Sequence, residues 1–337
     1  MKLLIVGGTR FLGRHLVDVA RARGHAVTLF NRGRSAPPPA GVESLVGDRA
    51  GDLAALQSGT WDAAIDTCGY LPRDVARVAA ALRPRVGALA FVSTVSVYAS
   101  SARPNDEDSP LAPLDDPDTT VVDGRSYGPL KAACETEVRR RFGGDALVLR
   151  PGLIVGPHDP TQRFSYWPAR LGRAADGDTV LAPGHAAAPV QFIDARDLAA
   201  FTLDALERGH RGVFNAVSPP GRWTFGELLD ACAAAAGVSV RFAWVDVAAL
   251  EALGLAPWSD LPLALPDDDE HRGFMQTDTT RAQAAGLALR PLEATVADTL
   301  AWHRSLPAAQ QAFDRAGLTP LREAAALAAL GLAPHGA

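Results

Sequence analysis

The sequence predicts an α/β protein whose core is a doubly wound parallel sheet, followed by a smaller C-terminal α/β unit. Two observations predict this fold class. Strand and helix patterns alternate through the first 92 residues, and a glycine-rich turn separates the first strand from the first helix. Short apolar runs at 3–6, 26–30, 42–46, 63–66 and 88–92 alternate with helical patterns at 11–23, 52–57 and 72–82. This alternation is typical of parallel sheets with right-handed helical crossovers.

The glycine-rich turn spans residues 7–13, Gly-Gly-Thr-Arg-Phe-Leu-Gly. A turn between a strand and a helix directs helix N-terminal amides at one point, which suits an anionic phosphate group. Gly7 permits the turn, Gly8 leaves the backbone bare beside a ligand, and Gly13 lets the helix pack closely on the strand. An ordinary turn without a ligand is the alternative. We expect a dinucleotide to be held by Gly7, Gly8, Thr9, Arg10, Phe11, Leu12 and Gly13.

The end of the second strand predicts which dinucleotide is bound. In dinucleotide-binding folds an acidic residue there holds the ribose hydroxyls of NAD, whereas arginine accommodates the 2′-phosphate of NADP. Here the sequence reads Asn31-Arg32-Gly33-Arg34, with two guanidinium groups and no carboxylate. Arg10 could reach the same phosphate, and solvated loop charges are the alternative interpretation. We therefore favour NADP(H) over NAD(H), with Asn31, Arg32 and Arg34 at its adenosine end.

Two further strand ends carry candidate cofactor residues. Asp48 follows the third strand, and its carboxylate either contacts the adenine amine or helps to start the next helix. Thr67 follows the fourth strand within Asp66-Thr67-Cys68-Gly69. This turn should lie at the carboxyl edge of the sheet beside the cofactor, where we expect it to act mainly through the shape of its backbone.

After the fifth strand the pattern is less regular. The proline- and aspartate-rich segment 102–123 is long for a loop in a compact domain, which is typical of a lid or a mobile segment. Helices are expected at 127–142, 194–207, 224–236 and 291–303, strands at 146–150, 190–193, 213–217 and 243–247, and one or two small helices at 305–337. Thr224 and Glu227 form a capping-box pattern. The period is lost at 156–188, and 257–272 should be a loop.

Tyr127 and Lys131 lie four residues apart on an expected helix, so their side chains point the same way. A free tyrosine has a pKa of about 10, which a nearby ammonium lowers by stabilising the phenolate. Tyr127 could then exchange a proton with a substrate hydroxyl or carbonyl, while Lys131 also holds the nicotinamide ribose. Thr94, at the end of a central strand, could hydrogen-bond the same substrate oxygen. This set of residues fits hydride transfer at a carbinol carbon, with the cofactor carrying the hydride.

Composition and charge exclude several classes of protein. The chain has 337 residues, of which 47% are hydrophobic and 21% charged, as in ordinary globular proteins that hold one large domain or two. A net charge of −5 provides no basic field for a nucleic acid. Apolar runs of membrane-spanning length and a signal peptide are both absent, so we expect a cytoplasmic protein without a membrane partner. Cys68, Cys134 and Cys232 lack metal-ligand spacing, so we expect free thiols and no metal site.

Five motifs occur in a characteristic order: the turn 7–13, Ser93-Thr94…Val97-Tyr98, Tyr127…Lys131, Arg150-Pro151-Gly152 and residues 192–197. In this combination, residues 1–303 resemble the extended short-chain dehydrogenase/reductases, the NAD-dependent epimerase/dehydratase group. The resemblance implies a Rossmann domain at 1–157 plus about 189–217, a substrate-binding domain at about 158–188 and 218–304, and a helical tail at 305–337. It also places Thr94, Tyr127 and Lys131 in the catalytic positions, and implies a homodimer formed through the helices near 72–82 and 127–142.

The sequence departs from the family pattern in places. Arg10 stands where the glycine turn usually has another glycine, as in atypical members that include relatives of chloroplast stem-loop RNA-binding proteins. Val95 and Ser96 replace the Asp-Glu pair of the sugar-nucleotide 4,6-dehydratases, which argues against that reaction. Ala99 replaces the glycine that usually follows Val-Tyr. Substrate candidates chosen from position alone, with packing or surface roles as the alternative, are Ser96, Arg163, Tyr166, Trp167, Arg170 and Gln191.

We therefore predict an NAD(P)-dependent oxidoreductase that acts on a hydroxyl/keto centre of a small molecule, sugar nucleotides included, with Tyr127 as general acid/base. A sugar-nucleotide 4-epimerase with tightly bound NAD is the first alternative, because it would use the same residues. A non-catalytic nucleotide-sensing or RNA-associated relative is the second. The basic loop 31–34 favours an exchangeable NADP(H), and therefore a reductase whose partner is a small-molecule substrate rather than a nucleic acid.

Overall fold

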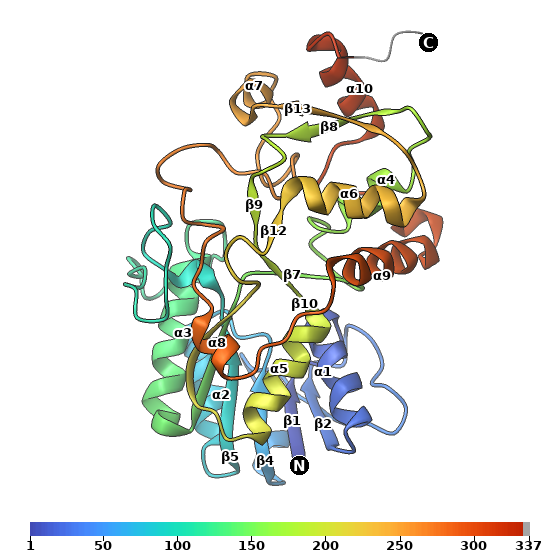
Figure 1. Ribbon diagram of the computed structural model, residues 1–337. Coiled ribbons are helices and arrows are strands. Elements are labelled where there is room, and N and C mark those ends of the chain that lie inside the picture. Colours follow the sequence, from blue (N-terminus) through green and yellow to red (C-terminus); the bar gives the residue numbers. More distant parts are fainter. Residues whose placement is uncertain (333–337) are drawn as a thin grey trace.

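The computed structural model describes residues 1–332 of the 337-residue chain. Seven strands form a parallel sheet in the order β3-β2-β1-β4-β5-β6-β11 (Figure 1). They are β1 (Lys2–Val6), β2 (Ala26–Asn31), β3 (Glu43–Val46), β4 (Trp61–Asp66), β5 (Val86–Val92), β6 (Ala146–Pro151) and β11 (Gly212–Ala216). The predicted doubly wound sheet is confirmed. Its strand order reverses between β1 and β4, and ligands of such sheets bind in the crevice at the carboxyl ends of the strands there.

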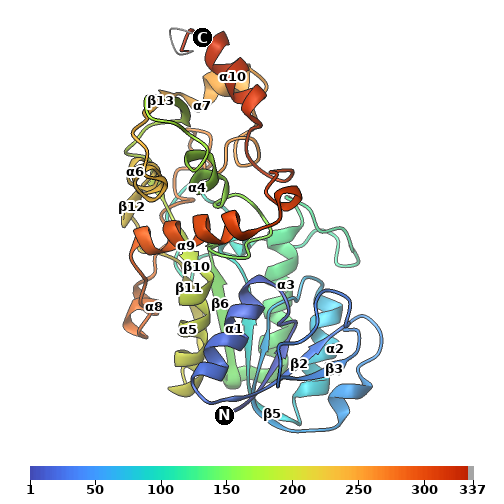
Figure 2. The same cartoon turned by 90° about the vertical axis from the view of Figure 1, so that its right-hand side faces the viewer.

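Helices cover both faces of the sheet (Figure 2). On one face lie α1 (Phe11–Ala22) and α5 (Ala195–Glu207), and on the other α2 (Pro72–Leu82) and α3 (Tyr127–Phe142). Strand β1 shows why two layers form, because its side chains alternate between the faces: Leu3 and Ile5 join the core under α1 and α5, while Leu4 and Val6 join the core under α2 and α3.

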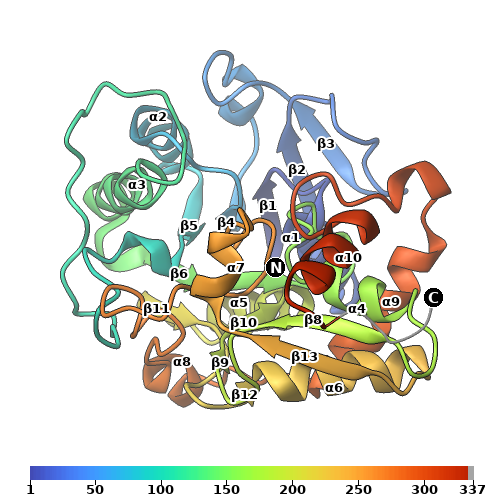
Figure 3. The ribbon, with the colours of Figure 1, turned by 90° about the horizontal axis from the view of Figure 1, so that it is seen from above.

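A second core lies beyond the carboxyl edge of the sheet (Figures 1 and 3). Its elements are α4 (Tyr166–Leu171), β8 (Thr179–Pro183), α6 (Phe225–Ala236), β13 (Arg241–Val245), α7 (Val247–Ala252), α9 (Leu292–Ser305) and α10 (Pro320–Ala329). Strands β8 and β13 pair in parallel. The second core therefore combines segments that are separated by more than a hundred residues in the sequence.

Short elements connect the two cores. Strand β7 (Leu153–Val155) pairs with β10 (Phe192–Asp194), and β9 (Pro189–Val190) pairs with β12 (Trp223–Thr224). The remaining short helices are α8 (Thr280–Ala284) and the 3-10 helices Ala54–Gln57, Val95–Val97, Gly143–Asp145 and Ala308–Gln310. No helix within residues 1–332 is both long and apolar enough to span a membrane.

The structure also corrects several predicted elements. The helix expected at 52–57 is a single 3-10 turn, and the strand expected at 243–247 lies at 241–245 and is followed at once by α7. The aperiodic segment 156–188 contains α4 and β8, and α8 was not predicted. The capping box on α6 is confirmed, because the Thr224 side chain accepts from the Glu227 amide and the Glu227 side chain accepts from the Thr224 amide. The tail forms a 3-10 turn and α10, and residues 333–337 of that prediction lie outside the described part.

Candidate active site

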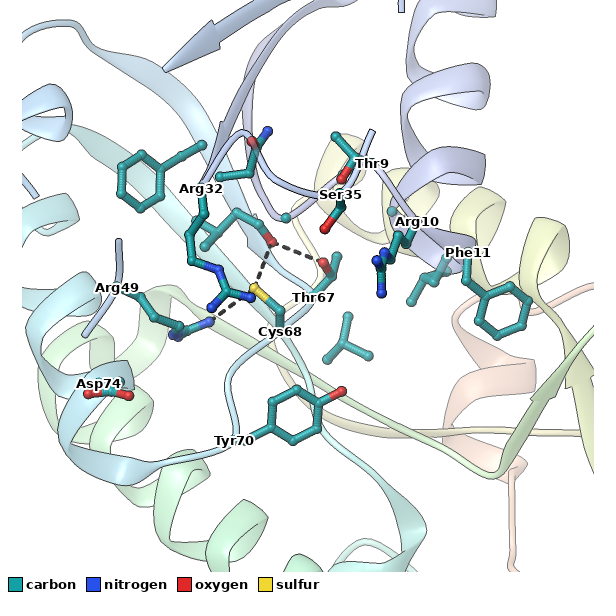
Figure 4. A pocket seen from close by; sticks show the side chains of 18 of the residues that line it. Thr9, Arg10, Phe11, Arg32, Ser35, Arg49, Thr67, Cys68, Tyr70 and Asp74 are labelled. Carbon is teal, nitrogen blue, oxygen red and sulfur yellow. Dashed lines mark hydrogen bonds between the residues drawn. The ribbon is translucent and has the colours of Figure 1, made fainter. Parts of the chain in front are cut away.

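A cavity of about 830 Å³ opens at the carboxyl edge of the sheet (Figure 4). It extends from loop 31–35 at one end to the start of α3 at the other. The structure brings together in its lining every residue that the sequence indicated for the cofactor: Gly7, Gly8, Thr9, Arg10, Phe11, Leu12, Gly13, Asn31, Arg32, Arg34, Asp48, Thr67 and Lys131. Tyr127 lines it too, whereas the lining adjacent to Thr94 is formed by Val92 and Ser93.

The glycine turn has the geometry of a cradle for a phosphate-containing ligand. Gly7 and Gly8 have φ of +106° and +89°, a conformation that side chains disfavour. A Cβ atom on Gly7 would lie 2.5 Å from Thr67 Oγ1, and one on Gly13 would lie 2.6 Å from Gly8 Cα. The backbone of the turn is therefore bare on its ligand side and packed tightly behind. These glycines fit a dinucleotide diphosphate at the start of α1.

The end of the cavity formed by loop 31–35 and Arg10, where we predicted the adenosine, is basic and open. Arg10, Arg32 and Arg34 are exposed, and within residues 1–332 their guanidinium groups form no ion pair or hydrogen bond with another side chain. Asn31 shapes this end, because its Oδ1 accepts a 2.7 Å hydrogen bond from the Gly33 amide. Asp48 uses one carboxylate oxygen to accept from the Ala50 amide at 3.0 Å, so part of its role is to form the turn after β3.

An ion pair that the sequence analysis missed lies at the middle of the cavity. Arg49 Nη1 and Nη2 donate to the two carboxylate oxygens of Asp66, at 3.0 and 2.7 Å. Burial acts to raise the pKa of Asp66, but the Arg49 guanidinium outweighs it and holds that pKa below its usual range. The available signal was Asp66 itself, a carboxylate that ends an apolar strand and is only 2% exposed. A charge in such a position requires a partner.

The three proposed catalytic side chains lie around the start of α3. Thr94 caps the 3-10 turn that follows β5, with its Oγ1 accepting from the Ser96 amide at 3.1 Å. Tyr127 is the first residue of α3, and its hydroxyl is close enough to Thr94 for that side chain to affect its pKa. Burial raises the pKa of Tyr127, and the Thr94 side chain acts against that rise. The two side chains that we expected to share a substrate oxygen therefore lie close together, and the Thr94 hydroxyl donates to Ser96 Oγ at 3.2 Å.

Lys131 is oriented differently from the prediction. Its Nζ donates to the carbonyls of Gly69 and Val92, both at 2.7 Å, and lies 4.1 Å from the centre of the Phe91 ring. Burial lowers the pKa of Lys131 to about 8. In this structure burial of the phenol dominates the pKa of Tyr127, and Lys131 is not among the groups that shift it. The expected lowering by the ammonium together with a nicotinamide ring stays a prediction.

The residue type at position 131 is itself informative. The chain contains only two lysines, Lys2 and Lys131, among its 33 basic residues. Arginine stays protonated in proteins, whereas a buried lysine can lose its proton near neutral pH. Lys131 is therefore a buried cationic side chain that can lose its proton near neutral pH, which the arginines of this chain cannot do.

Behind the cavity, a buried ion pair holds the end of β5 against α3. Arg150 donates to both carboxylate oxygens of Glu135, at 2.9 and 2.7 Å, and Ser93 donates to the same carboxylate at 2.6 Å. Glu135 is completely buried. The sequence analysis placed Arg150 and Ser93 in family motifs but did not find their common partner, which lies one helical turn after Lys131 on α3.

The substrate candidates chosen from position are scattered. Tyr166 and Trp167 are buried in the second core, and the side chain of Arg170 is bound to Glu323 at 2.6 Å. The side-chain amide of Gln191 donates to the carbonyls of Ser218 and Thr277, and its oxygen accepts from the Thr277 amide. Ser96 is exposed and accepts a hydrogen bond from Thr94 Oγ1. Arg163 is half-buried over the ring of Trp258, with its Nε unpartnered. The cavity lining contains none of these six residues.

A comparison with protein families agrees with this geometry. Residues 52–216 match the model of the NAD dependent epimerase/dehydratase family. This region of the chain belongs to that family. One relative is the chloroplast stem-loop binding protein of 41 kDa b from Arabidopsis thaliana, which is 29% identical over 258 residues. That match covers 70% of this chain and 63% of the plant protein, so the chain spans less than two thirds of its length.

Two solved structures have the same fold. The structure of the human epimerase family protein SDR39U1 (isoform 2) with NADPH has a TM-score of 0.60 and 24% identity, and the match covers 89% of this chain and 99% of that one. The Bordetella bronchiseptica enzyme WbmH, in complex with NAD+, has a TM-score of 0.63 and 19% identity, with 90% and 98% covered. At these identities the likeness shows the fold.

Proposed function

We propose that this protein is an NADP(H)-dependent oxidoreductase that interconverts a hydroxyl and a keto group on a small molecule. The observation that carries the proposal is a single cavity with two different ends. The glycine turn and three exposed arginines line one end, Tyr127 and Lys131 line the other, and Thr94 follows the lining residue Ser93. Membership of a nucleotide-dependent enzyme family supports the same activity.

The arginines support NADP(H) over NAD(H). Arg32 and Arg34 are exposed in the loop after β2, and Arg10 lies in the glycine turn on the same cavity. A guanidinium group binds phosphate through a planar pair of donors, and the end of β2 carries no carboxylate that would repel a 2′-phosphate. The glycine turn would hold the diphosphate, and Lys131 would lie toward the nicotinamide ribose.

Proton transfer is the task of the residues at the start of α3. A nicotinamide cofactor held by the glycine turn would supply or take up the hydride, and the residues of the chain would handle the proton. In the reducing direction the Tyr127 hydroxyl gives its proton to the carbonyl oxygen, and Thr94 donates a hydrogen bond to that oxygen. In the oxidising direction the tyrosine takes the proton back. The ammonium of Lys131, together with the positive charge of an oxidised nicotinamide ring, would favour the phenolate.

A titration with nucleotides tests the proposal directly. Purified protein is first denatured to identify any nucleotide that it releases, and native protein is then titrated with NADPH and NADH by calorimetry. We expect little resident nucleotide and NADPH affinity at least tenfold above that of NADH. Oxidation of NADPH is then followed with a panel of ketones and aldehydes, and we expect turnover with at least one. Failure to bind either dinucleotide, or tighter binding of NADH, would contradict the proposal.

The same preparation separates the epimerase alternative. Conversion of UDP-galactose without added cofactor, together with stoichiometric release of NAD on denaturation, would identify a sugar-nucleotide 4-epimerase instead. An RNA-associated relative would bind a stem-loop RNA and show no turnover with any carbonyl compound. Each alternative therefore predicts a result that the oxidoreductase does not.

A further inference from the structure

Exposed apolar side chains gather at the end of the cavity that Tyr127 lines. Six large hydrophobic side chains are well exposed within residues 1–332, and three of them are Tyr70, Val121 and Val122, at 47%, 61% and 45%. They come from two loops, after β4 and before α3, and Tyr70 and Val122 line the cavity together with Tyr127. Single exposed hydrophobic residues are ordinary, whereas a group of them beside a cavity marks a surface that a ligand covers. We call these three residues the apolar rim.

The apolar rim is adjacent to the residues proposed for catalysis. The centre of the Tyr70 ring lies 6.4 Å from that of Tyr127, and Lys131 Nζ lies 5.6 Å from the Tyr70 ring centre. Figure 4 shows Tyr70 projecting into the cavity from its loop after β4. A substrate whose carbonyl oxygen meets the Tyr127 hydroxyl would therefore have a substituent of that carbonyl beside the Tyr70 ring.

The two valines of the apolar rim are attached firmly to the start of α3. Ser126 Oγ donates to the carbonyl of Val121 at 2.6 Å, and Asp123 Oδ1 accepts from the Ser126 amide at 2.9 Å. The amide of Tyr127 donates to the carbonyl of Asp123 at 3.0 Å. Because these bonds order the loop before any ligand binds, covering Val122 costs little conformational entropy.

Within residues 1–332, no unpaired cationic side chain lines the cavity around Tyr127. Five cationic side chains line the whole cavity, and three of them are the exposed arginines at its other end. Arg49 is paired with Asp66, and Lys131 donates to two backbone carbonyls. An anionic group that left water at this end would lack a partner, so its burial would be unfavourable.

We propose that the substrate is a neutral ketone or aldehyde with an apolar chain or ring next to its carbonyl group, and that the apolar rim covers this chain or ring. The substrate class rests on the proposed function, because it requires a carbonyl compound at Tyr127. Each methylene group that leaves water on binding strengthens binding by about fourfold. A phosphate or carboxylate group gains nothing comparable at this end.

The first experiment measures kcat/KM for NADPH-dependent reduction of four methyl ketones by wild type. 2-Butanone, 2-hexanone and 2-octanone differ only in chain length, and we expect kcat/KM to rise by at least about twentyfold along the series. The fourth compound, 7-oxooctanoate, has the same chain as 2-octanone with a carboxylate at its far end. We expect it to be reduced at least about tenfold less efficiently than 2-octanone, because the carboxylate must stay in water.

The second experiment repeats the series with variants of the apolar rim. Tyr70→Ser and Val122→Thr should lower kcat/KM for 2-octanone by about tenfold and fivefold, mainly through KM, and by less than about twofold for 2-butanone. Tyr70→Phe keeps the ring and removes the hydroxyl, so it should recover the wild-type dependence on chain length. Leu321→Thr is the matched control, since Leu321 is 84% exposed on α10 and lies outside the cavity lining.

Calorimetric titration of each variant with NADPH separates the substrate from the cofactor. Unchanged NADPH affinity together with a flattened chain-length series supports the inference. A loss of NADPH affinity equal to the loss of kcat/KM would mean that Tyr70 and Val122 cover the nicotinamide ring, and the inference would be wrong. It would also be wrong if wild type reduced the four ketones equally well, or preferred 7-oxooctanoate. If wild type binds no NADPH, or oxidises it with no carbonyl compound, the proposed function itself fails.

Discussion

Both ends of the cavity are formed by the carboxyl edge of one parallel sheet, but the basic side chains are exposed to water at one end and buried at the other. At the adenosine end, Arg32 and Arg34 are exposed, so water stabilises their charges. At the catalytic end, Lys131 is 3% exposed and its charge is disfavoured by burial. A charge kept in water serves recognition of an anion, whereas a charge kept out of water can change its protonation near neutral pH. The difference indicates a binding end and a reactive end.

The largest expected effect is a loss of turnover, caused by a substitution at the end of the cavity that Tyr127 lines. Tyr127→Phe removes the phenolic hydroxyl that lies close to Thr94 and leaves the ring in place. General acid–base catalysis contributes about a hundredfold to ten-thousandfold, so NADPH-dependent turnover of whichever carbonyl substrate the panel identifies should fall by at least about a hundredfold. The dissociation constant of NADPH should not change, because the variant alters no group at the adenosine end. Steady-state kinetics and calorimetry measure the two quantities separately.

Thr94→Val is the companion variant, because it removes the other hydroxyl of the pair and keeps its shape. A smaller loss of turnover than in Tyr127→Phe is expected, since Thr94 orients the oxygen and transfers no proton. Turnover in Tyr127→Phe at the wild-type rate would show that the proton comes from elsewhere.

The next largest effect is a loss of NADPH affinity, caused by substitutions in loop 31–34 at the other end of the cavity. Arg32→Ala combined with Arg34→Ala removes two exposed guanidinium groups, and charge-assisted hydrogen bonds contribute about 1.5 to 3 kcal/mol each. Exposure to solvent reduces this contribution, so we expect NADPH affinity to fall by about thirtyfold and NADH affinity to change by less than about twofold. Raising the salt concentration should weaken NADPH binding to wild type more than to the variant. Calorimetric titrations at two ionic strengths measure these differences.

Arg21→Ala provides the control for general loss of positive charge. Arg21 is exposed on α1 and lies outside the cavity lining, so its removal should leave the preference for NADPH intact. An equal loss of NADH affinity in the double variant would mean that loop 31–34 supports the cavity shape and does not recognise the 2′-phosphate.

The same comparison explains which parts of the molecule could be predicted from the sequence. The sheet and the glycine turn follow from local rules: apolar runs alternate with helical patterns, and strand carboxyl ends share an edge. Loop 31–34 and Tyr127 could therefore be placed on one cavity. The orientation of Lys131 could not, because it depends on the carbonyls of Gly69 and Val92, which come from two other strand ends.

Long-range pairs account for the remaining differences. Arg49 in the loop after β3 pairs with Asp66 at the end of β4, and Glu323 pairs with Arg170 across 153 residues in the second core. Such pairs leave no periodic pattern in the sequence. A carboxylate at a position expected to be buried indicates that it has a partner, but it does not identify that partner. Tyr166, Trp167 and Gln191 were chosen from position, and the structure uses them in packing and backbone contacts because the second core is assembled from distant segments.

The smallest expected effect is on the pH dependence of the free energy of unfolding. It measures how far burial shifts the pKa of Lys131, and so tests the difference between the two ends of the cavity. Its pKa is about 8 in the fold, against a usual value of 10.5. In the unfolded chain the lysine stays protonated up to the higher value, so between these two values the unfolded state binds more protons and stability rises with pH. Below the lower value the fold carries the full cost of the buried charge, on the order of 3 kcal/mol.

Lys131→Met removes this cost together with two hydrogen bonds, which contribute about 1 kcal/mol each. We therefore expect the variant to be more stable than wild type by about 1 kcal/mol at neutral pH, and to lose that advantage as the pH approaches the value for a free lysine. Urea denaturation of both proteins across this pH range measures the difference. Lys2→Met, at an exposed lysine, should show no such dependence. A stability difference between Lys131→Met and wild type that is constant with pH would mean that burial does not shift Lys131, and that the two ends of the cavity hold their charges in the same way.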